Sequence, residues 1–391
     1  MKKLLALALL STSPLMAAEK NQLNTYAKDP CSSCGTCCEC EPCCVPKPKK
    51  CIDCECYTPA YYDLQCDWGA SVSVDFLYWY GKESNTPYAY IISGTAGSIF
   101  GDDTQLPNLD SSNTFGTSWD PGVRVGLGYN SGCDGWDSVL RWTYFRNTRK
   151  DSASQTLIGG TGETAFTSSG VQYPYSSLGV SFVPLLIGQN LSAKWKLTFN
   201  QIDWELGRKY WLSPCFTLRP YAGVRGAWTK TVLSTTVSSP AGFQTSAGLP
   251  NLEGKITSKL WGVGILGGIQ PNWHFCTNFI LYSNFNAALL WGDVDLKQSI
   301  VGTALGSDEA PIDINLNAKL KESKMTPVLD LGIGVRWEET WCCDRYRTAL
   351  DIGWEHHAWF EHANRIGARA NTDLCGNLYM SGLVVRALFD F

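Results

Sequence analysis

From Gly69 to the last residue, apolar and polar side chains alternate with a period of two, segment after segment. Successive side chains of a β-strand point to opposite faces, so this period predicts strands with one apolar face. Ten segments carry the pattern, which predicts an all-β chain. The pattern is interrupted at about residues 81–120, 131–135, 151–193, 207–214, 231–256, 271–273, 292–325, 340–345 and 361–377.

One segment, at residues 194–206, changes phase. Its apolar residues are odd-numbered at first, as in Trp195 and Phe199, and even-numbered later, as in Trp204. An extra residue in a strand shifts the side-chain alternation by one position. The sequence therefore predicts a β-bulge near Asn200.

The interruptions are alternately long and short, as in outer-membrane barrels, which have long loops on one side and tight turns on the other. Tryptophans also gather at strand ends, as expected at the two interfaces of a bilayer. Those beside the short turns are Trp136, Trp204, Trp273 and Trp337, and those beside the long loops are Trp79, Trp195, Trp228, Trp261, Trp291 and Trp359. A soluble sandwich would instead bury its aromatics between its sheets. We predict a transmembrane antiparallel β-barrel of about 10 strands, or about 12 or more if the loops at 81–120 and 151–193 contain hairpins.

The opposite face of the strands is rich in charge. It carries Asp75, Arg124, Arg141, Asp203, Glu205, Arg219, Arg225, Asp330, Arg336, Asp351 and Arg386, and we assign Lys194 and Lys196 to it as well. An arginine that faces lipid at mid-bilayer costs roughly 2–4 kcal/mol, so these side chains are predicted to face the lumen. They would either fill it with ion pairs or line a polar pore. Barrels of about eight strands are filled by side chains and those of about 16–18 hold a channel, so about ten favours a narrow or closed lumen.

The amino terminus predicts export. Lys2 and Lys3 precede an apolar run that ends at Leu10, and mostly small residues follow as far as Ala18, which is the pattern of a secretory signal peptide. The apolar run is too short to span a bilayer as a helix. We predict a signal peptide at residues 1–18, a cysteine-rich, mostly irregular periplasmic segment at 19–68, and the barrel at 69–391.

Eleven of the 17 cysteines lie within residues 31–66, among prolines that disfavour regular structure. Spacings such as that of Cys31 and Cys34 would suit a zinc or iron–sulfur site, whereas adjacent pairs such as Cys37 and Cys38 suit crosslinking better. Disulfides form in exported proteins, so we expect disulfides, with metal binding and inert packing as the alternatives. We assign no metal and no cofactor.

Both termini and the short turns of a barrel with an even number of strands face the periplasm. Sixteen of the 17 cysteines would then lie on that side, with only Cys375 in an external loop. We therefore expect crosslinks within the chain or to other cysteine-rich envelope proteins. The candidates are Cys31, Cys34, Cys37, Cys38, Cys40, Cys43, Cys44, Cys51, Cys54, Cys56, Cys66, Cys133, Cys215, Cys276, Cys342 and Cys343.

Four stretches resemble the major outer-membrane protein family of Legionella and of chlamydia-like bacteria, at intervals over roughly residues 70–391. They are VSVDFLYWYGKESNTPYAY, IDWELGRKYWLSPCFTLRPYAGVRGAW, LDLGIGVRWE and GNLYMSGLVVRALFDF. Arg219, Pro220, Gly223 and Arg225 match the family's central strand, and Arg386, Phe389, Asp390 and Phe391 match its terminus.

The resemblance implies an outer-membrane barrel with porin-like permeability, a disulfide-crosslinked architectural role in the envelope, and in some members adhesion to host cells. The dense cysteine block departs from the general family pattern and suggests the chlamydia-like branch. A non-conducting structural protein, or an adhesin that binds host surfaces through its loops, is the alternative function.

The last strand ends on Phe391, with apolar residues at every second position before it. This arrangement is the edge-strand signal recognised by barrel-assembly machinery. The residues assigned to the signal are Leu383, Val385, Phe389 and Phe391. Outer-membrane lipid and the assembly machinery are therefore expected partners.

Charge and motifs argue against other classes. The formal net charge is −4, and the chain lacks the basic block of a nucleic-acid binder. It also lacks a glycine-rich phosphate loop and a nucleophile elbow. The cluster of Glu355, His356, His357, Glu361 and His362 contains the residue types of a two-histidine, one-carboxylate metal site, but consecutive strand residues face opposite ways. We interpret these residues as solvated at a strand end, and we expect no enzymatic activity and no nucleic-acid partner.

Overall fold

The structure of the protein is a computed structural model, and all its described residues belong to the unit Pro46–Phe391. Its described residues are 69–391, apart from gaps at 85–86, 94–107, 131–135, 156–168, 173, 175–186, 189, 214, 239–250, 276–277, 306–310, 342–345 and 367–372. Within these residues no helix has the length and apolar character needed to cross a membrane.

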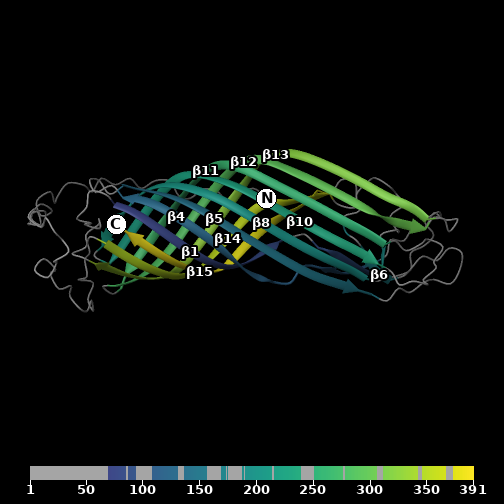
Figure 1. Ribbon diagram of the computed structural model, residues 1–391, viewed down its shortest axis with the longest axis horizontal. Helices are drawn as coiled ribbons and strands as arrows, with labels where there is room; N and C mark the ends of the chain where they lie inside the picture. Colours follow the sequence, from purple (N-terminus) through teal and green to yellow (C-terminus); the bar gives the residue numbers. More distant parts are fainter. Residues whose placement is uncertain are drawn as a thin grey trace, which may run out of the picture. The chain divides into compact units, whose positions relative to one another are not determined.

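Ten long strands form a closed antiparallel barrel (Figure 1). They are β1 (Gly69–Glu83), β4 (Trp119–Asn130), β5 (Trp136–Ser154), β8 (Asn190–Arg208), β10 (Phe216–Ser238), β11 (Asn251–His274), β12 (Phe279–Leu305), β13 (Pro311–Trp341), β14 (Tyr346–Ile366) and β15 (Asp373–Asp390). Each pairs with the next barrel strand along the chain, and the short β9 (Tyr210–Ser213) adds only to the end of β10. The predicted all-β barrel is confirmed, with ten strands.

The last strand closes the barrel on the first. In the register of β15 with β1, Asp390 lies opposite Ser71. The backbone of Phe391 continues this ladder with two hydrogen bonds to Ala70, at 3.0 and 2.9 Å. On the outer face of β15, Phe389 and Phe391 are exposed, while Leu383 and Val385 are half-buried.

The two longest loops contain short strands that do not join the barrel. They are β2 (Ala89–Ser93), β3 (Asn108–Asn113), β6 (Ser169–Gln172) and β7 (Ile187–Gly188), which form a separate four-stranded sheet. Strand β2 pairs with β3 of its own loop and with β6 of the next loop. Tyr88 and Ala89 are buried in the apolar core cluster, so the first loop packs on that cluster. Hairpins in these loops therefore leave the barrel at ten strands.

Strand β8 shows that the barrel has two zones. It pairs with β5 and β10 without any register shift, so the predicted bulge near Asn200 is wrong. The odd-numbered residues face inward along the whole strand. What changes near Asn200 is the environment: the inward side chains are apolar before it, as in Trp195, and polar after it, as in Asp203.

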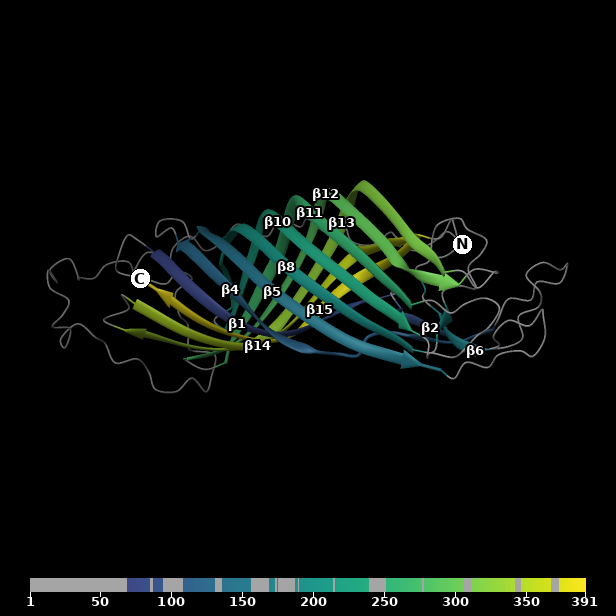
Figure 2. The same ribbon diagram turned by 45° about the vertical axis from the view of Figure 1, so that its right-hand side comes forward.

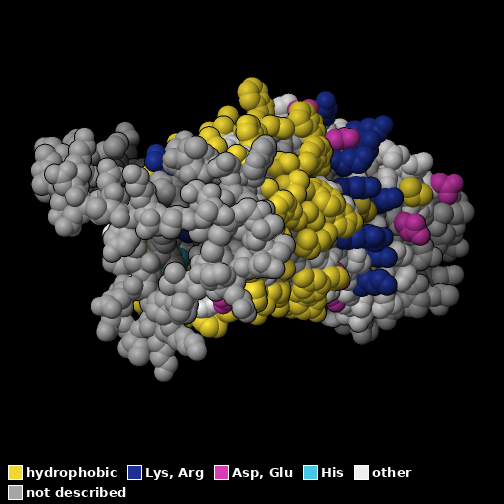
Figure 3. Space-filling model, turned by 60° about the vertical axis from the view of Figure 1, so that its left-hand side comes forward, with side chains coloured by type: hydrophobic (Ala, Val, Ile, Leu, Met, Phe, Trp, Pro, Cys, Tyr) yellow, Lys and Arg dark blue, Asp and Glu magenta, His cyan; other side chains and the backbone are white. Residues whose placement is uncertain are grey.

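We call these parts the belt zone and the rim zone. In the belt zone the outward residues are apolar and the inward residues polar; in the rim zone, nearer the long loops, the polarity is reversed. Strand β12 shows the same reversal, because Trp291 faces outward in the belt zone while Lys297 faces outward and Leu296 inward in the rim zone. Figure 3 shows the apolar band with basic side chains beside it.

The reversal explains why three of the predicted interruptions are largely strand. Strands β12 and β13 continue as far as Leu305 and from Pro311, through the interruption predicted at 292–325, and strands also extend into 231–256 and 361–377. Figure 2 shows these extended strands running toward the long-loop end. Apolar and polar side chains still alternate in these parts of the strands, but the apolar ones face inward. Strands that are predicted from an apolar outward face are therefore too short.

The same reversal corrects the predicted aromatic belt. Trp228, Trp261 and Trp291 are exposed on the outer face as expected. Trp79, Trp195 and Trp359, in contrast, are fully buried in the core cluster inside the barrel. Their position beside long loops in the sequence therefore reflects the apolar filling of the rim zone.

Candidate functional site

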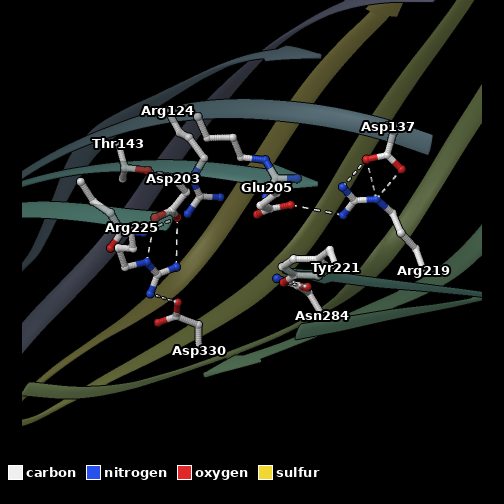
Figure 4. Close-up of polar contacts among 12 residues, drawn as sticks. Arg124, Asp137, Thr143, Asp203, Glu205, Arg219, Tyr221, Arg225, Asn284 and Asp330 are labelled. Carbon is white, nitrogen blue, oxygen red and sulfur yellow. Dashed lines mark hydrogen bonds and ion pairs between the residues drawn. The ribbon is translucent and has the colours of Figure 1, made fainter. Parts of the chain in front are cut away.

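The inside of the belt zone is built around Arg225 of β10. Its guanidinium donates two hydrogen bonds to Asp203 of β8, at 2.7 and 3.0 Å, and one to Asp330 of β13, at 2.7 Å (Figure 4). Strands β11 and β12 separate β10 from β13 in the sheet. The contact with Asp330 therefore crosses the lumen.

A second crossing is reached through His357 of β14, whose direct partner on the neighbouring strand β13 is Asp330. Its Nδ1 lies 2.7 Å from Asp330 and its Nε2 lies 3.2 Å from Glu355. Arg124 of β4 donates to both carboxylate oxygens of Glu355, at 2.9 and 2.8 Å. Since β15 and β1 separate β14 from β4, this bidentate pair also joins strands that are not neighbours.

The network continues to the closing strands through Asp75 of β1. Asp75 is fully buried and accepts hydrogen bonds from Arg124, at 3.1 Å, and from Arg386 of β15, at 2.9 Å. Asp351 of β14 lies 3.6 Å from Arg386 and accepts a bidentate pair from Arg336 of β13, at 2.7 and 2.8 Å. The strands that close the barrel are thus joined by side chains as well as by backbone.

A third group of contacts lies around Glu205 of β8. Glu205 accepts from Arg141 of β5, at 2.6 Å, and from Arg219 of β10, at 3.2 Å. Arg219 also pairs with Asp137 of β5 (Figure 4). The eleven arginine, aspartate and glutamate residues that we assigned to the lumen from the sequence thus lie in buried or half-buried ion pairs. The assignment of Lys194 and Lys196 to the lumen is wrong, because both face outward.

Sequence reasoning missed several members of this network. Glu355 and His357 were interpreted as solvated, but β14 continues to Ile366 and places both side chains inside the barrel. His362 is also buried, with its Nε2 2.7 Å from Thr229. The period-two spacing could have revealed Glu355 and His357, since both share the inward face of their strand with Asp351.

Trp79 separates the ionic network from the apolar side chains of the rim zone. Its ring lies 5.5 Å from the Arg124 guanidinium and 4.6 Å from the His357 ring. Beyond it lies a group of buried residues that we call the apolar plug: Leu77, Phe145, Trp195, Leu197, Phe199, Trp359 and Met380. Beyond Trp79 the interior is therefore mainly apolar, with Glu83, Arg149 and His362 as buried polar residues among the apolar ones.

Little space is left between these side chains. The cavity among Arg124, Arg225, Tyr282 and Asp330 has a volume of about 40 Å³. A water molecule needs roughly 10–15 Å³ of such space, so the cavity holds a few waters at most. Among the described residues, no histidine, cysteine and carboxylate side chains are grouped so as to hold a metal ion.

Most of the crosslink candidates lie outside the described residues. These are Cys31, Cys34, Cys37, Cys38, Cys40, Cys43, Cys44, Cys51, Cys54, Cys56, Cys66, Cys133, Cys276, Cys342 and Cys343. Cys215 is described and buried, and its carbonyl oxygen accepts a hydrogen bond of 2.8 Å from the His274 amide. Cys375 lies within β15, opposite Asn364 of β14, and not in a loop.

A closed antiparallel barrel with an apolar outer band and a charged interior defines the class of outer-membrane β-barrel proteins. The chain matches the family described as the Legionella pneumophila major outer membrane protein precursor over residues 65–391, and it belongs to that family. It is therefore a protein of the bacterial outer membrane. No curated protein matches the chain.

Solved structures with a similar arrangement of strands are also outer-membrane proteins. The outer membrane protease OmpT from Escherichia coli is 10% identical, with a TM-score of 0.39 over 85% of this chain and 99% of that chain. A major outer membrane protein from Thermus thermophilus is 10% identical, with a TM-score of 0.27 over 82% of this chain and 99% of that chain. Likeness at this level assigns no function.

Proposed function

We propose that this protein is a closed, load-bearing barrel of the outer membrane rather than an open porin. The observation that carries the proposal is the pair of ionic contacts across the lumen, Arg225 with Asp330 and Arg124 with Glu355. Charged groups in a water-filled pore would be solvated individually, whereas these are buried and partnered. The porin-like permeability implied by the family would require these contacts to part.

The apolar plug supports the same proposal. Leu77, Leu197 and Trp359 are fully buried on the axis side of the rim zone, where a pore would need a wetted wall. An apolar constriction excludes water and ions even before it is sterically closed. Two barriers of different chemistry therefore lie in series along the barrel.

Planar-bilayer recording tests the proposal directly. Refolded full-length protein is expected to give no stable current steps in 1 M KCl at moderate voltage, because the ionic network and the plug block the lumen. Insertion is checked independently by protease protection in liposomes. Steady open steps from inserted protein would contradict the closed barrel and favour a porin.

We further propose that the amino-terminal segment and the short turns face the periplasm and carry disulfides to one another or to other cysteine-rich envelope proteins. The number of cysteines and their distribution along the chain support this arrangement. Such bonds would give a closed barrel its architectural role.

Electrophoresis of isolated envelopes tests the crosslinks. Without reductant the protein is expected to migrate as multimers, which collapse to a monomer after reduction. Alkylation of free thiols before lysis controls for bonds that form during preparation. A single sharp monomer band without reductant would argue against the covalent lattice.

A second candidate function is adhesion through the long loops. The observation that favours it is the pairing of β2 with β6, because two different loops build one folded sheet at the long-loop end. A folded surface can present side chains to a host receptor at little entropic cost. The non-enzymatic role stays a prediction.

A further inference from the structure

A cluster of basic side chains lies on the outer face of the rim zone, directly beside the apolar band. We call it the basic patch, and its members on β5, β8, β10 and β11 are Arg146, Lys150, Lys194, Lys196, Lys230 and Lys259. Figure 3 shows dark blue side chains in a row along the edge of the yellow band. All six alternate with buried residues, so they point away from the lumen.

The register places like charges opposite each other within this patch. Lys150 is the partner of Lys194, and Lys230 is the partner of Lys259. Side chains directly opposite on neighbouring strands lie close together, and like charges in this position are destabilising. The barrel alone thus leaves an unfavourable concentration of positive charge.

Carboxylates of the barrel wall offset this charge only at one edge. In the β-ladders, Lys150, Lys194, Lys196 and Lys230 have no carboxylate as a direct partner. Lys259 has Asp295 opposite, but that carboxylate also lies 3.5 Å from Lys297. The arrangement is therefore complementary to an anion with more than one negative charge.

The patch borders exposed aromatic surface on its membrane side. Trp228 and Trp261 lie opposite each other, two residues closer to the apolar band than Lys230 and Lys259, and about half of each side chain is exposed. A hollow of about 440 Å³ is lined by these four side chains and also by Lys321 and the carboxylates Asp293 and Asp295, so the anion would be held on its Lys230 and Lys259 side. Exposed tryptophans next to lysines are typical of the headgroup level of a bilayer.

We propose that the basic patch binds the phosphorylated sugar headgroup of a glycolipid in the leaflet on the long-loop side. Ammonium groups on several strands would contact phosphate oxygens as point charges, and the acyl chains would lie along the tryptophans and the apolar band. The headgroup would also join four neighbouring strands from outside, at the level where the barrel leaves the hydrocarbon.

Lipid binding by refolded full-length protein in uncharged detergent micelles tests this site. The probes are diphosphoryl lipid A and the same lipid with its phosphates removed, with affinity read by native mass spectrometry. Wild-type protein is expected to bind the phosphorylated form selectively. The K194Q/K230Q variant is expected to bind it roughly 30-fold more weakly, since each lysine at an anionic lipid surface contributes a factor of about five and the two factors multiply.

The matched control is K82Q/K319Q, which removes two exposed outward lysines from β1 and β13. It is expected to bind as wild type does. Without lipid, K194Q/K230Q should be at least as stable as wild type because repulsion is relieved, so a loss of binding cannot be ascribed to unfolding. Two results would show a response to bulk charge and overturn the proposal. One is an equal loss of affinity in both variants. The other is binding of phosphatidylglycerol that is as tight as binding of lipid A and is weakened as much by K194Q/K230Q.

Discussion

Replacement of Arg225 by methionine is expected to lower the free energy of unfolding by about 3–5 kcal/mol. The methionine roughly preserves the volume of the arginine but removes the positive charge that neutralises Asp203 and Asp330. Both carboxylates are nearly inaccessible to solvent, so water cannot replace the lost partner. Asp203 then loses its ion pair with Arg225, and Asp330 retains its contact with His357. The cost is therefore that of buried carboxylates deprived of their shared partner, and it should exceed the cost of any single exposed substitution.

Unfolding in urea, followed by tryptophan fluorescence in detergent micelles, measures the loss. Lys319→Met is the matched control, because it removes one positive charge from an exposed position on β13 and should change stability by less than about 0.5 kcal/mol. The triple variant D203N/R225M/D330N removes the charges together and should recover much of the loss. An R225M variant as stable as wild type would mean that the lumen is wet, contrary to the closed barrel.

The period-two pattern was sufficient to predict the barrel because it depends only on local geometry. Each belt-zone strand has lipid on one side and buried ionic groups on the other, so its apolar face can be read from the sequence. The inward position of Asp75, Asp203 and Arg225 follows from that alternation. Their partners do not follow from it.

Partners across the lumen depend on closure and register. Asp330 meets Arg225 because β13 lies across the lumen from β10, and no local pattern encodes that relation. Within one strand, Glu355 and His357 were accessible to the same reasoning as Asp351. They were missed because they were interpreted as solvated residues at the end of the strand.

The phase change in β8 was visible in the sequence but was ascribed to the wrong cause. A bulge and a change of solvent produce the same switch from odd to even apolar positions. The lysines decide between them, since Lys194 and Lys196 in an unbulged strand must face outward beyond the apolar band. A strand that passes from lipid to water while keeping its register has to exchange its polar and apolar faces.

Replacement of Trp359 by alanine is expected to cost about 3–5 kcal/mol, comparable to the loss of Arg225 but for a different reason. Trp359 is fully buried in the apolar plug, with its ring 5.4 Å from that of Phe199 in an edge-to-face contact. Truncation would leave a cavity inside the wall of a rigid barrel, which cannot collapse to fill it. The loss is again measured by urea unfolding.

Two further variants separate packing from other contributions. The Trp359 indole nitrogen makes no hydrogen bond to any described residue, so Trp359→Phe, which keeps an aromatic ring, should cost much less than the alanine variant. Trp291→Ala removes an indole that is 68% exposed on the outer face and should cost less than about 1 kcal/mol. If Trp359→Ala were no worse than Trp291→Ala, the rim zone would not be a packed core. The reversal of polarity along the barrel would then need another explanation, because burial of the apolar face is what stabilises strands that extend beyond the lipid.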